Sequence, residues 1–295
     1  MKYRYVNGII AVIAILIIIA ILINPLLTNP GHNPEEASNT LLIVSINFGE
    51  KQILKKIITA NISVMDALKS VANVSTAYDG KFVIGINNVT QDSEHAWFYY
   101  VNGILANVGA NDYIIHKGDI IRWDYHKWDY SNVVSAEILD FPEPFLHGYD
   151  GKVYETTIVV NETLLPLAES LRKFMEFKGI SVKIENSINL SEMERENVIV
   201  IGYPYSVGER LNELHSTLGW KYYVDAPFIV DENGKKYKGA FIQISQSPFN
   251  PKGLGACENV IMWIYGSDNS SISSAISTLT NGTMETFWYF QGEEI

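Results

Sequence analysis

The stretch WFYYVNGILANVGANDYIIHKGDIIRWDYHKWDY, residues 97–130, places nine aromatic residues in thirty-four positions. Two strand-like runs within it, Trp97–Val101 and Ile120–Tyr125, are bordered by the turn signals Asn102-Gly103 and Lys117-Gly118-Asp119. Short strands separated by such turns are typical of β-hairpins. The stretch therefore predicts a hairpin-rich β unit, and its aromatic side chains indicate a packing or binding face rather than a catalytic one.

The residues before this stretch extend the β unit. Leu41–Phe48 and Gln52–Thr59 are predicted strands joined by a turn at Gly49-Glu50. A helix is expected next, because Ser63 with Asp66 resembles a capping box and apolar residues recur at helical spacing up to Ala72. Phe82–Ile86 is a further predicted strand. A hairpin, a helix and more strands in this order are what a β-grasp fold requires.

Three motifs in this region carry a resemblance to a known family. They are W-x-Y-x-V-N-G from Trp97, G-A-x-x-Y from Gly109 and G-D-x-I-x-W-x-Y from Gly118. Together they resemble extracellular domains related to the C-terminal domain of transcobalamin and intrinsic factor, over residues 41–130. The resemblance implies a β-grasp-like fold. Because that domain closes over one face of cobalamin in those proteins, it also implies a corrinoid or another large planar molecule as ligand. The helical partner domain of those proteins has no counterpart in this sequence.

Aromatic residues could form the wall of such a ligand site, since planar ligands are held by apolar surfaces with a few polar contacts. Strand alternation equally predicts that Trp97 and Trp123 face a hydrophobic core, and Asn102 is also a natural turn residue. Trp128 and Tyr130 follow the strand in a polar run and are the stronger candidates for ligand contact. The predicted ligand-binding set is Trp97, Tyr99, Asn102, Tyr113, Trp123, Tyr125, Trp128 and Tyr130.

A change of pattern predicts a second domain. Residues 141–152 contain prolines and glycines typical of a linker between domains at residues 41–140 and 153–295. Strands and helices alternate beyond it, which predicts an α/β domain with a mainly parallel sheet. The predicted strands are Thr156–Val160, Ile180–Ile184, Val198–Ile201, Ala240–Ser245 and Val260–Tyr265, and the predicted helices are Leu164–Lys178, Val207–Leu218 and Ser270–Leu279.

Residues 198–279 contain the run VIVIGYPYSVGERLNEL, a later F-I-Q-I-S strand, an N-P-K turn and the run VIMWIYGSDNSSISSAISTL. Together these segments resemble α/β modules found in archaeal surface-layer and other exported proteins. Ligands of an open parallel sheet usually lie at the carboxyl ends of its strands. Here those ends are Gly202–Ser206 and Gly266–Asn269. A glycine after an apolar strand also serves simply to turn the chain into a helix, and both interpretations stay open.

The amino terminus predicts a membrane segment. Residues 1–23 combine Lys2 and Arg4 with the apolar run Ile9–Ile23. The run of fifteen residues would span about 23 Å as a helix, so a signal peptide is an alternative to an uncleaved anchor. An anchor is favoured because no A-x-A-like cleavage site follows. The positive-inside rule places the terminus in the cytoplasm and the bulk of the chain outside, with residues 24–40 as a stalk.

Composition agrees with an exported protein. The net charge of −11 argues against nucleic acid or anionic lipid as the main partner. The single cysteine, Cys257, excludes an internal disulfide and is best interpreted as a buried structural thiol. Glycosylation is predicted at the seven N-x-S/T sequons, which begin at Asn61, Asn73, Asn88, Asn161, Asn189, Asn269 and Asn281.

The motifs of catalysis are missing. The sequence has no P-loop, H-E-x-x-H, G-x-S-x-G or C-x-x-C motif. Its six histidines lack metal-ligand spacing, and the nearest approach to a cluster is Asp124, His126 and Asp129. No enzyme, cofactor or metal is therefore predicted. The chain is predicted to be a membrane-tethered extracellular protein that binds a small molecule, with a structural or interaction glycoprotein of the cell envelope as the alternative. A hydrolase using Cys257 would need that thiol exposed beside a histidine.

Overall fold

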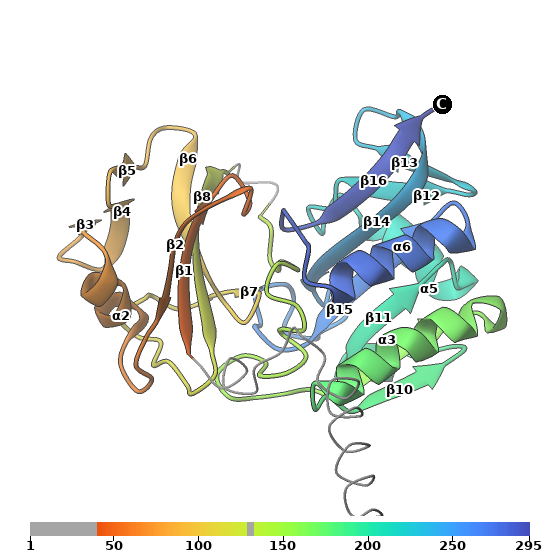
Figure 1. Cartoon of the computed structure of the whole chain (residues 1–295), viewed down its shortest axis with the longest axis horizontal. Coiled ribbons are helices and arrows are strands. Elements are labelled where there is room, and N and C mark those ends of the chain that lie inside the picture. Colours follow the sequence, from red (N-terminus) through yellow and green to blue (C-terminus); the bar gives the residue numbers. More distant parts are fainter. Residues whose placement is uncertain (1–39, 129–132) are drawn as a thin grey trace, which may run out of the picture. The chain divides into compact units, whose positions relative to one another are not determined.

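The computed structural model describes residues 40–128 and 133–295, and residues 40–295 belong to one compact unit. Within it lie a five-stranded, an eight-stranded and a three-stranded sheet together with several helices (Figure 1). The predicted mixture of helices and strands is thus confirmed at the level of fold class. The predicted membrane segment lies outside the described residues. Of the helices within them, none is both long and apolar enough to cross a membrane.

The five-stranded sheet belongs to the amino-terminal half, residues 40–152. Its strand order is β2-β1-β8-β6-β7, with β1 and β8 parallel and all other pairs antiparallel. The hairpins predicted on either side of the helix are therefore joined through their central strands. The bounds are β1 (Leu41–Ile46), β2 (Lys51–Ile57), β6 (His95–Val101), β7 (Ile104–Leu105) and β8 (Ile120–Lys127).

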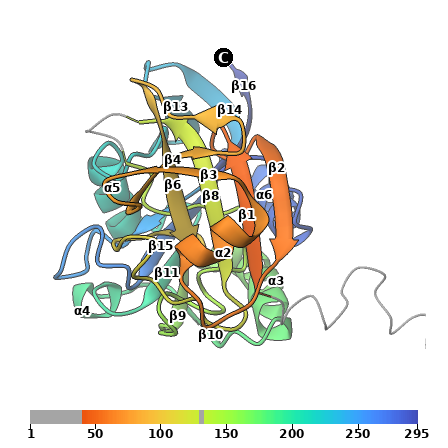
Figure 2. The same ribbon diagram turned by 90° about the vertical axis from the view of Figure 1, so that its left-hand side faces the viewer.

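Helix α2 (Val64–Val71) covers one face of this sheet. Figure 2 shows the helix in front of β1 and β8. It begins as predicted, because the Ser63 hydroxyl accepts the N–H of Asp66 at 3.0 Å. Its buried residues join the core on β1, β6 and β8. A small antiparallel sheet follows it, made of β3 (Val74–Ala77), β4 (Phe82–Ile86) and β5 (Val89–Thr90).

The eight-stranded sheet belongs to the carboxy-terminal half, residues 153–295. Its strands follow the order β10-β9-β11-β15-β14-β13-β12, and β16 pairs with β14. The bounds are β9 (Thr156–Val160), β10 (Val182–Glu185), β11 (Asn197–Ile201), β12 (Tyr222–Asp225), β13 (Phe228–Asp231), β14 (Lys236–Gln246), β15 (Val260–Gly266) and β16 (Tyr289–Glu294).

Only part of this sheet is parallel, which corrects the prediction of a mainly parallel sheet. Strands β10, β9, β11 and β15 are parallel neighbours, whereas β12, β13, β14 and β16 pair antiparallel, as do β14 and β15. Parallel neighbours need a crossover connection, usually a helix. Between β13 and β14 the chain instead makes a tight turn at Gly234, and between β14 and β15 it forms a loop without a helix.

Helices cover both faces of the eight-stranded sheet. Because successive strand residues point to opposite faces, Ile158 and Val160 pack with α3 (Leu165–Phe177) and α6 (Asn269–Thr280). Val159 belongs to the other face, with α5 (Tyr205–Leu214) and α4 (Leu190–Met193). The short 3-10 helix η2 (Glu162–Leu164) precedes α3.

The segment predicted as a linker, residues 141–152, is packed against the rest of the unit. Phe145 is fully buried and Tyr149 nearly so. Both belong to a hydrophobic cluster that contains residues of the two halves. Its prolines and glycines therefore shape an irregular but buried connection.

Candidate functional site

Four of the eight predicted ligand-binding residues lie in the hydrophobic core. Trp97, Tyr99, Tyr113 and Trp123 are each at most 8% exposed, and they pack in the same cluster as α2. The rings of Tyr99 and Trp123 lie 5.1 Å apart across β6 and β8. The packing interpretation of the strand alternation therefore describes Trp97 and Tyr99 on β6 and Trp123 on β8, whereas Tyr113 joins the core from the connection between β7 and β8.

Asn102 shapes a buried turn. Its side chain donates to Asp119 Oδ1 and to the Gly148 carbonyl, both at 2.8 Å, and accepts the N–H of Ile120. The next residue, Gly103, has a φ of 76°, and a Cβ there would meet the Glu137 carbonyl at 2.9 Å. The Asn-Gly signal thus marks a turn at residues 102–103. The side-chain amide of Asn102 connects this turn to the turn at residues 117–119.

Tyr125 and Trp128 are partly exposed near the end of β8. The Tyr125 hydroxyl donates to the Thr90 carbonyl and to Asp92, and Trp128 makes an edge contact with Phe98. Tyr130 lies outside the described residues. None of the other seven residues, which the structure describes, lines either of the two hollows described below. Their role in ligand binding stays a prediction.

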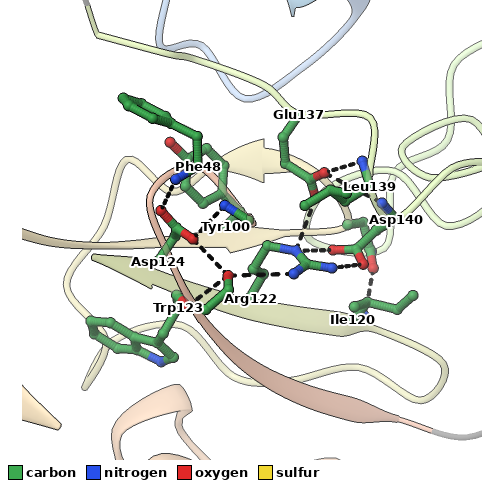
Figure 3. Close-up of polar contacts among 12 residues, drawn as sticks. Phe48, Tyr100, Ile120, Arg122, Trp123, Asp124, Glu137, Leu139 and Asp140 are labelled. Carbon is green, nitrogen blue, oxygen red and sulfur yellow. Dashed lines mark hydrogen bonds and ion pairs between the residues drawn. The ribbon is translucent and has the colours of Figure 1, made fainter. Parts of the chain in front are cut away.

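The face of β8 opposite to the one that carries Trp123 holds buried polar residues. Two of them, Arg122 and Asp124, are labelled in Figure 3. Asp124 accepts hydrogen bonds from Ser45 Oγ at 2.6 Å and from the N–H groups of Phe48 and Gly49 at 2.9 Å. The same carboxylate also contacts His126, whose Nδ1 lies 2.8 Å from Asp124 Oδ1. Asp124 and His126 thus share one face, as their spacing predicts, and the carboxylate stabilises the turn between β1 and β2.

Arg122 lies between two further carboxyl groups on this face. Its guanidinium donates to both oxygens of Asp140, at 3.0 and 2.5 Å, and its Nε is 3.6 Å from Glu137 Oε1. Burial alone would raise the pKa of Asp140, but the charge and hydrogen bonds of Arg122 lower it. Burial and the nearby Asp140 charge raise the pKa of Glu137 well above its ordinary value. Glu137 is therefore harder to ionise than an ordinary glutamate, and the close ion pair of this cluster is the one between Arg122 and Asp140.

Cys257 is buried, as the sequence predicts. Its thiol donates to the Leu105 carbonyl at 3.2 Å, and burial raises its pKa to about 11. A thiol with a raised pKa is a poor nucleophile at neutral pH because little thiolate is present. This contact also joins the two halves of the unit.

Gln246, at the end of β14, is the centre of that junction. Its side-chain oxygen accepts the N–H groups of Gly255 and Cys257, at 3.1 and 2.8 Å. Its side-chain nitrogen donates to the carbonyls of Leu105 and Ser135, at 3.4 and 3.2 Å. The almost fully buried side-chain amide of Gln246 thus connects β14, the loop after it and two segments of the amino-terminal half.

A cavity of about 300 Å³ lies against this junction, and we call it the junction pocket. Both halves contribute to it, and most of its side chains are apolar or small. Concave, mainly apolar sites with a few polar groups are the usual form of a small-molecule site. The lining residues are Leu105, Ala106, Asn107, Val133, Ser135, Thr217, Leu218, Gln246, Leu254 and Gly255.

A second hollow is wider and polar. It measures about 810 Å³ and lies between the β1–β2 hairpin and residues 282–286. Lys55, Arg122 and Asp140 line it together with the exposed Glu50 and Glu285. Arg122 and Asp140 form an ion pair with each other. The described residues that line this hollow therefore offer no uncompensated buried charge that would select a ligand.

The strand ends highlighted by the sequence do lie side by side. The N–H of Gly202 donates to the Ile264 carbonyl at 2.8 Å, and the Gly202 carbonyl accepts the indole N–H of Trp263. At the start of α6, Asp268 accepts the N–H of Ser271. These contacts complete local turns and a helix cap.

The sequence contains a signal for the junction that the predictions missed. Strand β14 reads KYKGAFIQISQ, with Gln243, Ser245 and Gln246 in a run that is otherwise apolar and buried. A buried amide requires hydrogen-bond partners. Gln243 pairs with the backbone of Lys221 and Tyr222. Buried polar residues in this strand therefore mark the places where irregular segments are attached.

Comparison with known sequences adds one match. A family model described as "Domain of unknown function (DUF4430)" matches residues 61–127. The match begins before α2 and ends with β8, so it lies within the region for which the sequence predicts a β-grasp-like domain. No curated protein matches the sequence.

Proposed function

We propose that this chain is a membrane-tethered extracellular protein that binds a small organic molecule in the junction pocket. The pocket carries the proposal, because it is concave, mainly apolar and built from both halves of one compact unit. Its volume of about 300 Å³ lies within the range of small-molecule sites. The tether and the extracellular location rest on residues 1–23 and on charge.

We further propose that the amino-terminal half is a β-grasp-like domain. Two hairpins flank α2, and their central strands β1 and β8 are parallel. The match at residues 61–127 falls inside the resemblance to transcobalamin-like domains at residues 41–130. This likeness favours a binding role over a catalytic one, although fold alone does not set function.

The resemblance suggests a corrinoid as the ligand, but the size of the pocket favours a smaller molecule. A volume of about 300 Å³ lies at the lower end of the usual range. A corrinoid, as a large macrocycle, would extend mostly outside it. We therefore include cobinamide as one arm of the test and take a smaller organic molecule as the main expectation.

The test is native mass spectrometry of the full chain purified from membranes of a host that produces it. Thr217→Trp should fill the pocket with a bulky ring from an exposed position. The neighbouring Ser216→Trp adds the same ring outside the lining. We expect a bound mass in the wild type and in Ser216→Trp, and its loss in Thr217→Trp. No bound mass, and no saturable heat on adding cobinamide, would contradict the proposal.

A structural role in the cell envelope is the second candidate. Its specific support is that the asparagines of all seven sequons are exposed, as glycan attachment requires. These residues are distributed over both halves, from Asn61 to Asn281. Intact-mass analysis before and after enzymatic removal of N-glycans tests for glycosylation. A glycosylated chain that never carries a small molecule would favour this second role.

A further inference from the structure

We propose that the junction pocket selects an uncharged and mainly apolar molecule. This inference rests on the proposed function and specifies the class of ligand. The walls supply apolar contact through Leu105, Ala106, Val133, Leu218 and Leu254. The described residues that line the pocket include no Asp, Glu, Lys, Arg or His. Among these described lining residues, an ionised ligand would therefore lose water without meeting an opposite charge.

Three polar side chains of the pocket, those of Ser135, Asn107 and Gln246, already have hydrogen-bond partners. Ser135 Oγ is 3.0 Å from Ser245 Oγ and accepts the N–H of Gln246. The Asn107 amide donates to the Gly255 carbonyl and accepts from Tyr149. The Gln246 amide uses both its nitrogen and its oxygen to join the two halves. Binding a charged group through these side chains would break contacts that hold the junction together.

Thr217 is the polar lining residue outside this network. It is exposed, in the connection between α5 and β12, and its neighbour Leu218 is 2% exposed and apolar. This pair places one hydroxyl at the rim and an apolar wall behind it. A ligand with a hydrocarbon body and a single neutral oxygen matches that arrangement. Burial of an isolated ion in such surroundings is strongly unfavourable, whereas a neutral hydroxyl needs only one partner.

A matched series of probes tests the inference. Benzyl alcohol, benzoate and benzylamine share one ring and differ in charge. Each is titrated by calorimetry into the full chain in lipid nanodiscs. Thr217→Trp serves as the reference that subtracts partition into lipid, and Ser216→Trp as the control for an added indole. We expect pocket-dependent heat for benzyl alcohol and an affinity at least about tenfold weaker for both ions.

A second variant reverses the selectivity. Leu254 lines the pocket and is 40% exposed, so it tolerates a polar replacement. Leu254→Asp should raise the affinity for benzylamine over that for benzyl alcohol, and the isosteric Leu254→Asn should not. Tighter pocket-dependent binding of benzoate or benzylamine by the wild type would overturn the inference, as would the absence of binding by all three probes. Because native mass spectrometry decides the proposed function independently, the two failures are distinguishable.

Discussion

The two faces of strand β8 differ in chemistry although both are buried. Ile121 and Trp123 face α2 and form part of an apolar core. Arg122, Asp124 and His126 face the other way and are at most 5% exposed. The comparison shows that alternation along a strand predicts which side chains share a face, but not whether a polar face meets water. Here the polar face is covered, and its charges are held by specific partners.

The largest expected effect lies on the apolar face. Trp123→Ala should lower the free energy of unfolding by about 3–5 kcal/mol, because a buried indole is replaced by a cavity. Trp128→Ala removes a partly exposed ring at the end of the same strand and should cost about 1 kcal/mol or less. Urea unfolding followed by circular dichroism measures both. Equal costs would show that the two aromatic residues do not differ in burial.

Removal of Arg122 should be nearly as costly on the polar face. Arg122→Ala leaves Asp140 buried without its bidentate partner, and loss of one member of such a pair typically costs about 3–5 kcal/mol. The double variant Arg122→Met with Asp140→Leu removes both charges and should recover most of that loss. Urea midpoints of the two variants provide the comparison. A double variant no more stable than Arg122→Ala would contradict the role of the ion pair.

Asp124→Asn should have an intermediate effect. The amide keeps one acceptor oxygen but cannot satisfy all the donors that surround the carboxylate. We expect a loss of about 1–3 kcal/mol, the usual cost of unpaired buried polar groups. Hydrogen exchange of the Phe48 and Gly49 amides reports the site directly. Unchanged protection of these two amides would show that Asp124 does not hold the turn.

Glu137→Gln should change how stability depends on pH. Because the folded-state pKa of Glu137 lies above its ordinary value of 4.5, the folded protein retains a proton that the unfolded chain releases. The contribution of Glu137 is therefore fully present below about pH 4.5 and declines as pH rises towards the folded-state pKa. We expect Glu137→Gln to gain stability relative to wild type between pH 5 and 8.

The quantity to measure is the difference in the free energy of unfolding between the wild type and Glu137→Gln. The difference is needed because Glu143 and His147 also have raised pKa values and contribute to the pH dependence of both proteins. Thermal unfolding at several pH values gives this difference for matched buffers. A constant difference across the range would show that Glu137 is ionised in the folded state. Asp140 acts in the opposite direction, since its lowered pKa makes stability fall as pH drops below its ordinary value of 3.8.

Much of the fold follows from local sequence patterns. The Ser63 cap places α2, and strands β4 and β9 have the predicted bounds. The short strands β3, β5, β7, β12, β13 and β16 were missed. Strand β12 reads YYVD and β16 reads YFQGEE, so neither has a long alternating pattern. Such strands depend on pairing with an existing sheet edge, which the local sequence does not encode.

The candidate site was harder to predict than the fold. The aromatic stretch attracts attention because its residues are large, yet Trp97 and Trp123 are core residues. The junction pocket instead combines common residues such as Leu105, Thr217 and Leu254, and Leu105 precedes the other two by more than a hundred positions. Only tertiary packing brings them together. Gln246 was the available clue, since a buried amide at a strand end requires partners from elsewhere in the chain.

The most direct test of the central claim compares two sites in one experiment. Native mass spectrometry is carried out on the full chain, on Thr217→Trp and on Trp128→Ala. If the ligand lies in the junction pocket, the bound mass is lost in Thr217→Trp and retained in Trp128→Ala. Retention in Thr217→Trp with loss in Trp128→Ala would contradict the account and place the ligand at the aromatic end of β8.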